Sequence, residues 1–186
     1  MRILVAYASR HGATQGIAER IGQVLERHSH EVTVRPAQQA DALERYDAFI
    51  IGSAAYAGRW LGEATAFVRR HRSFLESRPV WLFSSGPVGP EKVDAKGRDV
   101  LLASEPKEFG EFERAIQPRD KEVFFGAYDP DQAPIGLMEG LGERIFRLIP
   151  EARAALPAGD YRDWEAIEAW ANSIARELAP VPVGSS

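Results

Sequence analysis

Ser9 and Thr14 flank Gly12 directly after the first apolar run of the chain. The two hydroxyls are hydrogen-bond donors, and a glycine lets the backbone approach a ligand closely. A helix is expected next, and its first turn adds free N–H groups and the positive end of its dipole. We therefore predict a site for one phosphate or another anion, formed by Ser9, Arg10, His11, Gly12, Ala13 and Thr14.

This segment lacks the phosphate-binding motifs of common nucleotide-binding proteins. It has one glycine and no lysine, so it matches neither G-x-x-x-x-G-K-[ST] nor G-x-G-x-x-G. Nucleoside triphosphates and dinucleotides are therefore weakly supported as ligands. In an alternative interpretation, Ser9 and Thr14 merely cap the helix.

Two further segments with ligand-binding potential follow apolar runs. One offers Tyr56 and Trp60, which would stack on or border a flat heterocycle, and the other offers hydroxyls and backbone groups. For both aromatic residues, ligand contact and packing stay equally open. A flat ligand with a single phosphate is flavin mononucleotide (FMN) rather than a dinucleotide. The predicted contacts in these segments are Ser53, Ala54, Ala55, Tyr56, Ala57, Gly58, Trp60, Ser84, Ser85, Gly86 and Pro87.

Short apolar runs alternate with amphipathic segments along the chain. Strands are expected at residues 3–8, 30–35, 46–53, 80–85 and 121–127. Helices are expected at residues 15–27, 61–77, 109–116 and 135–149, and after an N-cap at Asp163. This alternation predicts an α/β fold with a doubly wound, five-stranded parallel sheet in the order 2-1-3-4-5. The ligand segments would then meet where the winding reverses, at the carboxyl ends of the strands.

The composition is that of an ordinary globular domain, and we expect one domain over residues 1–179 with a loose tail at 180–186. A net charge of −4 gives no field that would attract nucleic acid. The absence of cysteine excludes disulfides and thiolate metal sites, so electron chemistry would need a bound cofactor. We find no leader or membrane-spanning segment, and expect a cytoplasmic protein with at most peripheral contact to the inner face of the membrane.

The segment from Ser9 to Thr14 resembles the phosphate loop of the flavodoxin family, whose motif is T/S-x-T-G-x-T. His11 stands where the family has a hydroxyl residue, which removes one phosphate donor, and a protonated imidazole would compensate. The resemblance implies the flavodoxin-like strand order and FMN as the cofactor.

Within that family the chain resembles the flavodoxin-type, menaquinone-dependent protoporphyrinogen oxidases. That resemblance implies an FMN-dependent oxidoreductase of heme biosynthesis, passing electrons from a small-molecule substrate such as a porphyrinogen to a quinone. Residues 84–89 contain no aromatic side chain, which would leave one flavin face open to a flat substrate. The resemblance rests on residues 46–53, the loop that contains Gly58, and residues 66–71, 126–127 and 161–167.

Two other functions stay open. One is a flavodoxin-like carrier that shuttles electrons to a redox partner protein, and the other is a flavin-free binding module. Residues 91–119 are acidic in part, which weakens a membrane-docking role for them. Arg69, Arg70 and Arg72 are expected to form a solvated helix face, with contact to porphyrin propionates as the minority interpretation. Packing in the core is expected for Trp81, Trp164 and Trp170.

Overall fold

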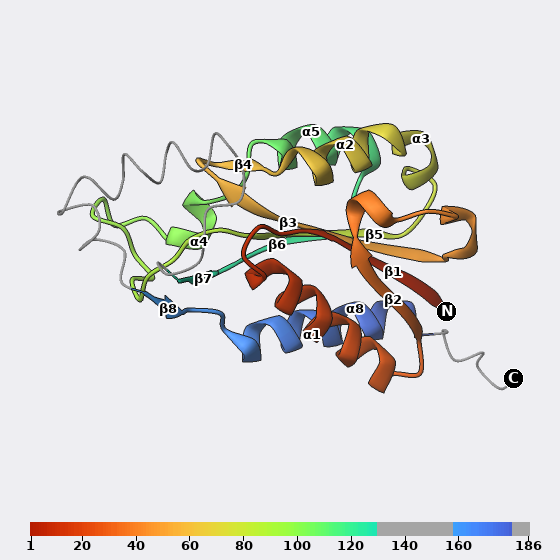
Figure 1. Cartoon of the computed structure of the whole chain (residues 1–186), viewed down its shortest axis with the longest axis horizontal. Helices are drawn as coiled ribbons and strands as arrows, with labels where there is room; N and C mark the ends of the chain where they lie inside the picture. Colours follow the sequence, from red (N-terminus) through yellow and green to blue (C-terminus); the bar gives the residue numbers. More distant parts are fainter. Residues whose placement is uncertain (130–157, 180–186) are drawn as a thin grey trace, which may run out of the picture.

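Parallel strands form the centre of the protein, for which a computed structural model describes residues 1–129 and 158–179 (Figure 1). Across the main sheet they lie in the order β2-β1-β3-β5-β6. The predicted α/β fold, with its five parallel strands in the order 2-1-3-4-5, is therefore confirmed. In chain order the strands are β1 (Arg2–Ala8), β2 (Glu31–Pro36), β3 (Ala48–Tyr56), β5 (Val80–Ser85) and β6 (Asp120–Phe124).

Helices cover both faces of this sheet (Figure 1). On one face lie α1 (Ala13–Arg27) and α8 (Trp164–Leu178), and on the other lie α2 (Gly62–Arg70), α3 (Arg72–Leu75) and α5 (Glu108–Ile116). The central strands are apolar on both sides because they contribute to both cores. In β3, Ile50 packs into the core beneath α1 and α8, whereas Phe49 and Ile51 pack beneath α2 and α5. Short helices complete the described chain at η1 (Ala37–Gln39), η2 (Leu43–Arg45) and α4 (Val100–Ala103).

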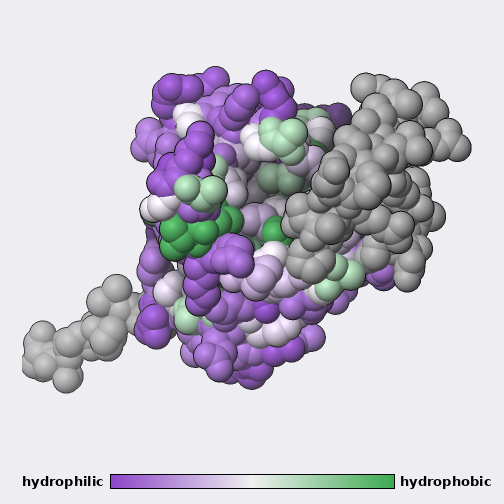
Figure 2. All heavy atoms as spheres, turned by 90° about the vertical axis from the view of Figure 1, so that its left-hand side faces the viewer, coloured by the Kyte–Doolittle hydropathy of each residue, from purple (hydrophilic) through white to green (hydrophobic). Residues whose placement is uncertain are grey.

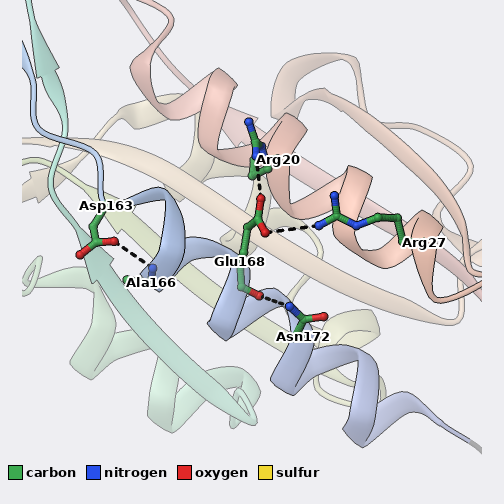
Figure 3. Close-up of polar contacts among 6 residues, drawn as sticks. All are labelled: Arg20, Arg27, Asp163, Ala166, Glu168 and Asn172. Atoms are coloured by element: carbon green, nitrogen blue, oxygen red, sulfur yellow. Dashed lines mark hydrogen bonds and ion pairs between the residues drawn. The ribbon is translucent and has the colours of Figure 1, made fainter.

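Helices α1 and α8 are joined by an ion-pair network that Figure 3 shows in close-up. Helix α8 begins as predicted, with Asp163 Oδ1 accepting a hydrogen bond of 3.0 Å from the Ala166 N–H. Further along, Glu168 pairs with Arg20 at 2.6 Å and with Arg27 at 3.5 Å (Figure 3). Sequence-distant helices thus become neighbours on one face of the sheet.

The single helix predicted over residues 61–77 is wrong, because the structure divides it at His71 into α2 and α3. His71 has φ −104° and ψ 15°, outside helical geometry. The break redirects the chain so that Phe74 packs edge-on against Phe49, with ring centroids 5.7 Å apart, and Leu75 is fully buried. Packing on the sheet therefore outweighs the continuous helical pattern.

The strand predicted over residues 121–127 is also too long. Strand β6 ends at Phe124, and the chain then forms the short ribbon of β7 (Ala127–Tyr128) with β8 (Gly159–Asp160). Gly126 fixes this turn, since its N–H donates to the Pro87 carbonyl at 2.8 Å and its carbonyl accepts from the Tyr161 N–H at 3.1 Å. These long-range hydrogen bonds have no local sequence signal.

Two of the three tryptophans expected in the core are buried there, Trp81 and Trp170. Trp164 differs: it is only partly buried, with guanidinium groups over its ring at 4.4 Å (Arg162) and 5.1 Å (Arg20). The helix predicted over residues 135–149 and the tail at 180–186 lie outside the described residues. Among the helices of the described part, none has the length and apolar character required to cross a membrane.

Half-buried Glu122 on β6 should make stability depend on pH. Burial raises the pKa of its carboxyl, and the charges of Asp120 and Glu105 add to that rise. A raised native pKa means that the folded state holds the proton more tightly, so this stabilisation is present below the unfolded pKa and is lost as pH rises through the folded pKa.

Glu122→Gln removes the titrating carboxyl, so we expect it to remove this loss of stability with rising pH. The free energy of unfolding in urea should then depend less on pH in the range above the ordinary pKa of glutamate. Glu111→Gln is the control of opposite sign, because its hydrogen bonds from Arg69 lower the pKa of Glu111. Glu111→Gln should therefore lower the free energy of unfolding at pH values above the ordinary pKa of glutamate, and should lower it less in acid. Parallel pH profiles for the two variants would contradict the assignment.

Candidate functional site

The carboxyl ends of β1, β3 and β5 bring the three predicted segments to one end of the molecule (Figure 1). The strand register places the three segments at the same height along the strands, because Ser53 of β3 lies opposite both Ala8 of β1 and Ser84 of β5. Figure 2 views this end directly and shows hydrophobic side chains gathered within a largely hydrophilic surround. This is the end of a doubly wound sheet at which ligands bind.

The first segment, residues 9–14, makes a tight turn into α1. Gly12 adopts the left-handed conformation (φ +80°), and its N–H donates to Ser9 Oγ at 3.1 Å. The helix begins at Ala13 and has no side-chain cap. The interpretation that Ser9 and Thr14 merely cap the helix is therefore wrong, since Ser9 holds the turn itself. The first-turn N–H groups are left without intrahelical acceptors.

Thr14 is a buried polar residue of this segment. Its side chain is 1% exposed, and its hydroxyl has no hydrogen-bond partner in the part of the chain that the structure describes. A buried hydroxyl without a partner is costly, so such groups usually mark a bound water, ion or ligand. At the uncapped end of a 15-residue helix, an anion would satisfy it.

Two other residues of this segment face different neighbours. Arg10 forms a 2.6 Å ion pair with Glu63 in the first turn of α2, and this hydrogen bond lowers the pKa of Glu63. His11 borders a hollow of about 400 Å³ together with Tyr128, Asp129 and Asp160 of the β7–β8 region. Glu63 and the ribbon residues were not predicted, because nothing in their local sequence marks them.

The second segment, expected to be a loop, is a β-hairpin of β3 and β4 (Arg59–Trp60). Ala57 and Gly58 both have positive φ, at +50° and +69°. Two such central residues are typical of the tight turns that join antiparallel strands. Tyr56, at the end of β3, is 44% exposed. The base of the hairpin is closed by Ser53, whose Oγ accepts a hydrogen bond from the Leu61 N–H at 3.0 Å.

Trp60 does not lie on the ligand side of this hairpin. Its side chain is 5% exposed and packs against Phe109 and Phe112 of α5, with ring centroids 5.5 Å apart in each case. Of the two roles left open by the sequence, the structure supports packing. The reason is register, because Trp60 pairs with Ala55 across the hairpin and is directed into the core beneath α5.

The start of α5 clamps the hairpin in place. Buried Glu108 accepts a 3.1 Å hydrogen bond from the Trp60 N–H, and the Lys107 N–H donates to the Gly58 carbonyl at 3.1 Å. These contacts fix the turn on both sides before any ligand arrives. Glu108 was predicted only to belong to the partly acidic segment of residues 91–119.

Glu108→Ala should therefore lower the free energy of unfolding by about 1–3 kcal/mol, because it leaves the buried Trp60 N–H without an acceptor. Urea denaturation would measure this loss. Glu111→Ala on the same helix is the matched control, since its ion pair with Arg69 is exposed and should be worth about 1 kcal/mol or less. Equal losses in the two variants would contradict a clamping role for Glu108.

The third segment begins inside the sheet. Ser84 and Ser85 belong to β5 and are 0% and 3% exposed, and the Ser84 hydroxyl has no partner within the described residues. At Gly86 a Cβ atom would lie 3.2 Å from the Ala55 carbonyl oxygen, so this glycine lets the second and third segments touch. Pro87 anchors Gly126 through its carbonyl. Backbone groups, rather than serine hydroxyls, are thus the accessible chemistry of this segment.

Several solved structures have a similar fold. Flavodoxin 2 from Bacillus cereus is 21% identical with a TM-score of 0.56, covering 96% of this chain and 100% of that chain. A flavodoxin from the domain Archaea is 16% identical with a TM-score of 0.55, covering 95% and 98%. Rubredoxin oxygen:oxidoreductase from Desulfovibrio gigas is 12% identical with a TM-score of 0.55, but the match covers 95% of this chain and only 36% of that longer chain.

At these identities the likeness shows the fold alone. No match to a curated protein sequence was found. The model of the flavodoxin domain, however, matches residues 4–135, which include all three ligand segments and most of the chain. The chain therefore belongs to the flavodoxin domain family.

Proposed function

We propose that the protein binds FMN at the carboxyl ends of β1, β3 and β5 and carries electrons between redox partners. The observation that carries this proposal is the Thr14 hydroxyl, which is buried at the uncapped start of α1 and has no partner among the described residues. It fits one phosphate group better than it fits a purely structural turn. The family match supports a flavin as the ligand.

Each segment has its own task in this proposal. The Thr14 hydroxyl and the first-turn N–H groups of α1 would hold the phosphate, with His11 beside them. Tyr56 and the turn at Ala57–Gly58 would border the ring from one side, and the backbone at Gly86–Pro87 from the other. When bound, FMN supplies electron chemistry that the side chains of a cysteine-free chain do not provide. The clamped hairpin would keep the ring contacts fixed, which limits reorganisation during electron transfer.

The first test is an absorption spectrum of the purified protein after loading with FMN and desalting. Retained bands at roughly 370 and 450 nm, which are properties of the flavin, would support the proposal. Failure to retain any flavin would contradict it and would favour a flavin-free binding module. Riboflavin, which has the ring without the phosphate, is the matched ligand control, and weaker retention of riboflavin is expected.

One observation favours a second candidate, an FMN-dependent oxidoreductase of the protoporphyrinogen oxidase type. Residues 84–89 contain no aromatic side chain that could cover the flavin, which would leave one ring face open to a flat substrate. The family and structural matches support the general flavodoxin assignment rather than this narrower one. Oxidation of a porphyrinogen by the FMN-loaded protein with a quinone as acceptor would favour the enzyme. Electron exchange with redox proteins alone would favour the carrier.

A further inference from the structure

Arg162, in the turn between β8 and α8, reaches the first turn of α1. Its Nη1 donates a hydrogen bond of 3.2 Å to the Ala13 carbonyl, and its side chain is 17% exposed. Gly16 leaves the space for this contact, because a Cβ atom there would lie 2.6 Å from the same nitrogen. An element more than 140 residues away in sequence is thus built against the predicted phosphate segment.

The guanidinium is held rigidly on its other sides. Nε and Nη2 donate to the two carboxylate oxygens of Asp160 at 2.7 Å and 2.6 Å, and the ring of Trp164 lies under the group with its centroid 4.4 Å from Cζ. These hydrogen bonds also lower the pKa of Asp160, so the pair stays charged. A bidentate, stacked arginine is pre-organised, because few of its rotamers remain accessible.

The charge of Arg162 is paired with Asp160, so the positive charge left uncompensated here is that of the helix itself. The N-terminal end of α1 carries the positive end of its dipole, and it has no acidic residue in its first turn and no side-chain cap. The buried Thr14 hydroxyl at the same turn, which finds no partner in residues 1–129 and 158–179, independently points to an anionic ligand. A phosphate would compensate the helix dipole, whereas the guanidinium charge is already paired with Asp160.

The hydrogen bond to Ala13 also couples Arg162 to the ligand side of the turn. The Ala13 carbonyl and the Thr14 N–H belong to one peptide group, and a charge-assisted hydrogen bond to the carbonyl polarises that group. The Thr14 N–H then becomes a stronger donor toward an anion. The helix geometry leaves this N–H without an intrahelical acceptor.

We propose that Arg162 is a positioning residue for the phosphate of FMN, acting through its hydrogen bond to the Ala13–Thr14 peptide group. This inference rests on the proposed binding of FMN. It assigns to the C-terminal segment a part in ligand binding that the three sheet-end segments alone do not supply.

The test compares dissociation constants for FMN and riboflavin, measured by flavin fluorescence, in the wild type and in Arg162→Met. We expect the variant to bind FMN about tenfold more weakly, as for the loss of a charge-assisted contribution, with riboflavin changed by less than about twofold. Arg162→Lys should recover part of the FMN affinity, because it keeps the charge but not the bidentate geometry. If Arg162→Met does not fold, Arg162→Lys tests the same role, with a smaller expected loss of FMN affinity.

Arg20→Met is the matched control. Arg20 also lies over the ring of Trp164, with Cζ 5.1 Å from the ring centroid. Its ion pair is with Glu168 of α8 (Figure 3). Both ligands should bind this variant as they bind the wild type. Equal weakening of FMN and riboflavin binding in Arg162→Met, or no weakening of either, would overturn the role of Arg162. Neither result would contradict the proposal that the wild-type protein binds FMN. A wild type that binds neither flavin would overturn the proposed function itself, and this inference with it.

Discussion

Replacing Thr14 with valine is expected to stabilise the flavin-free protein and, at the same time, to weaken its binding of FMN. The valine side chain has nearly the shape of threonine but removes a buried hydroxyl that has no partner in the described structure. Relief of that desolvation cost should raise the free energy of unfolding by about 1 kcal/mol. Loss of a hydrogen bond to a charged phosphate should raise the Kd for FMN roughly 10- to 100-fold.

Urea denaturation and flavin fluorescence titration measure the two effects separately. Thr65→Val is the matched control, because Thr65 on α2 is also buried, at 8% exposure, and its hydroxyl likewise has no partner among the described residues. That variant should gain stability without a change in FMN affinity. If both variants alter FMN affinity to the same degree, the Thr14 hydroxyl is not a phosphate ligand.

A second large effect is expected at Gly52, in the centre of β3. A Cβ atom at this position would lie 2.0 Å from Cζ of Phe83, which is its register partner on β5. The Phe83 ring has little freedom to move, because it packs against the rings of Phe124 and Trp170, with centroids 6.4 Å and 6.2 Å away. We expect Gly52→Ala to lower the free energy of unfolding by about 1–3 kcal/mol through overpacking.

Gly110→Ala provides the comparison for this substitution. Gly110 lies within α5, and a Cβ atom there would meet nothing within 4 Å, so the alanine should gain up to about 1 kcal/mol of stability through its helix propensity. Gly52→Ala should cost less stability in a Phe83→Leu background than in the wild type, because the smaller side chain leaves room for the Cβ atom, and this difference would demonstrate coupling between the two positions. A Gly52→Ala protein as stable as Gly110→Ala would show that the ring moves aside freely.

Local pattern was sufficient for the order of elements and for the sheet. The runs at residues 3–8 and 80–85 are apolar at consecutive positions, and only a strand covered on both faces needs such a pattern. Once helices alternate with such strands, few topologies remain, and the order 2-1-3-4-5 is among them. The same pattern located the ligand end of the sheet, because every parallel strand delivers its following segment there. Asp163 was predictable as an N-cap because capping depends on residues only a few positions apart.

Contacts between distant segments had to be found in the tertiary structure. The orientation of Trp60 depends on the register of the hairpin and on the aromatic rings of α5. The presence of a tryptophan at this position therefore left both ligand contact and core packing open. Ser84 and Ser85 were predicted both at the end of a strand and as ligand contacts; the strand is confirmed, and the packing around it buries both side chains.

Arg162 is the clearest case of this division. Gly16 within α1 was a faint sign of a close neighbour, since glycine is unfavourable inside a helix, but it does not say which neighbour. The sequence by itself determined a flavodoxin-like scaffold and the three segments at one end of its sheet, because these follow from periodicity and from the direction of parallel strands. Only the tertiary structure decided which side chains lie beside the predicted phosphate position, because that depends on how residues more than 100 positions apart pack together.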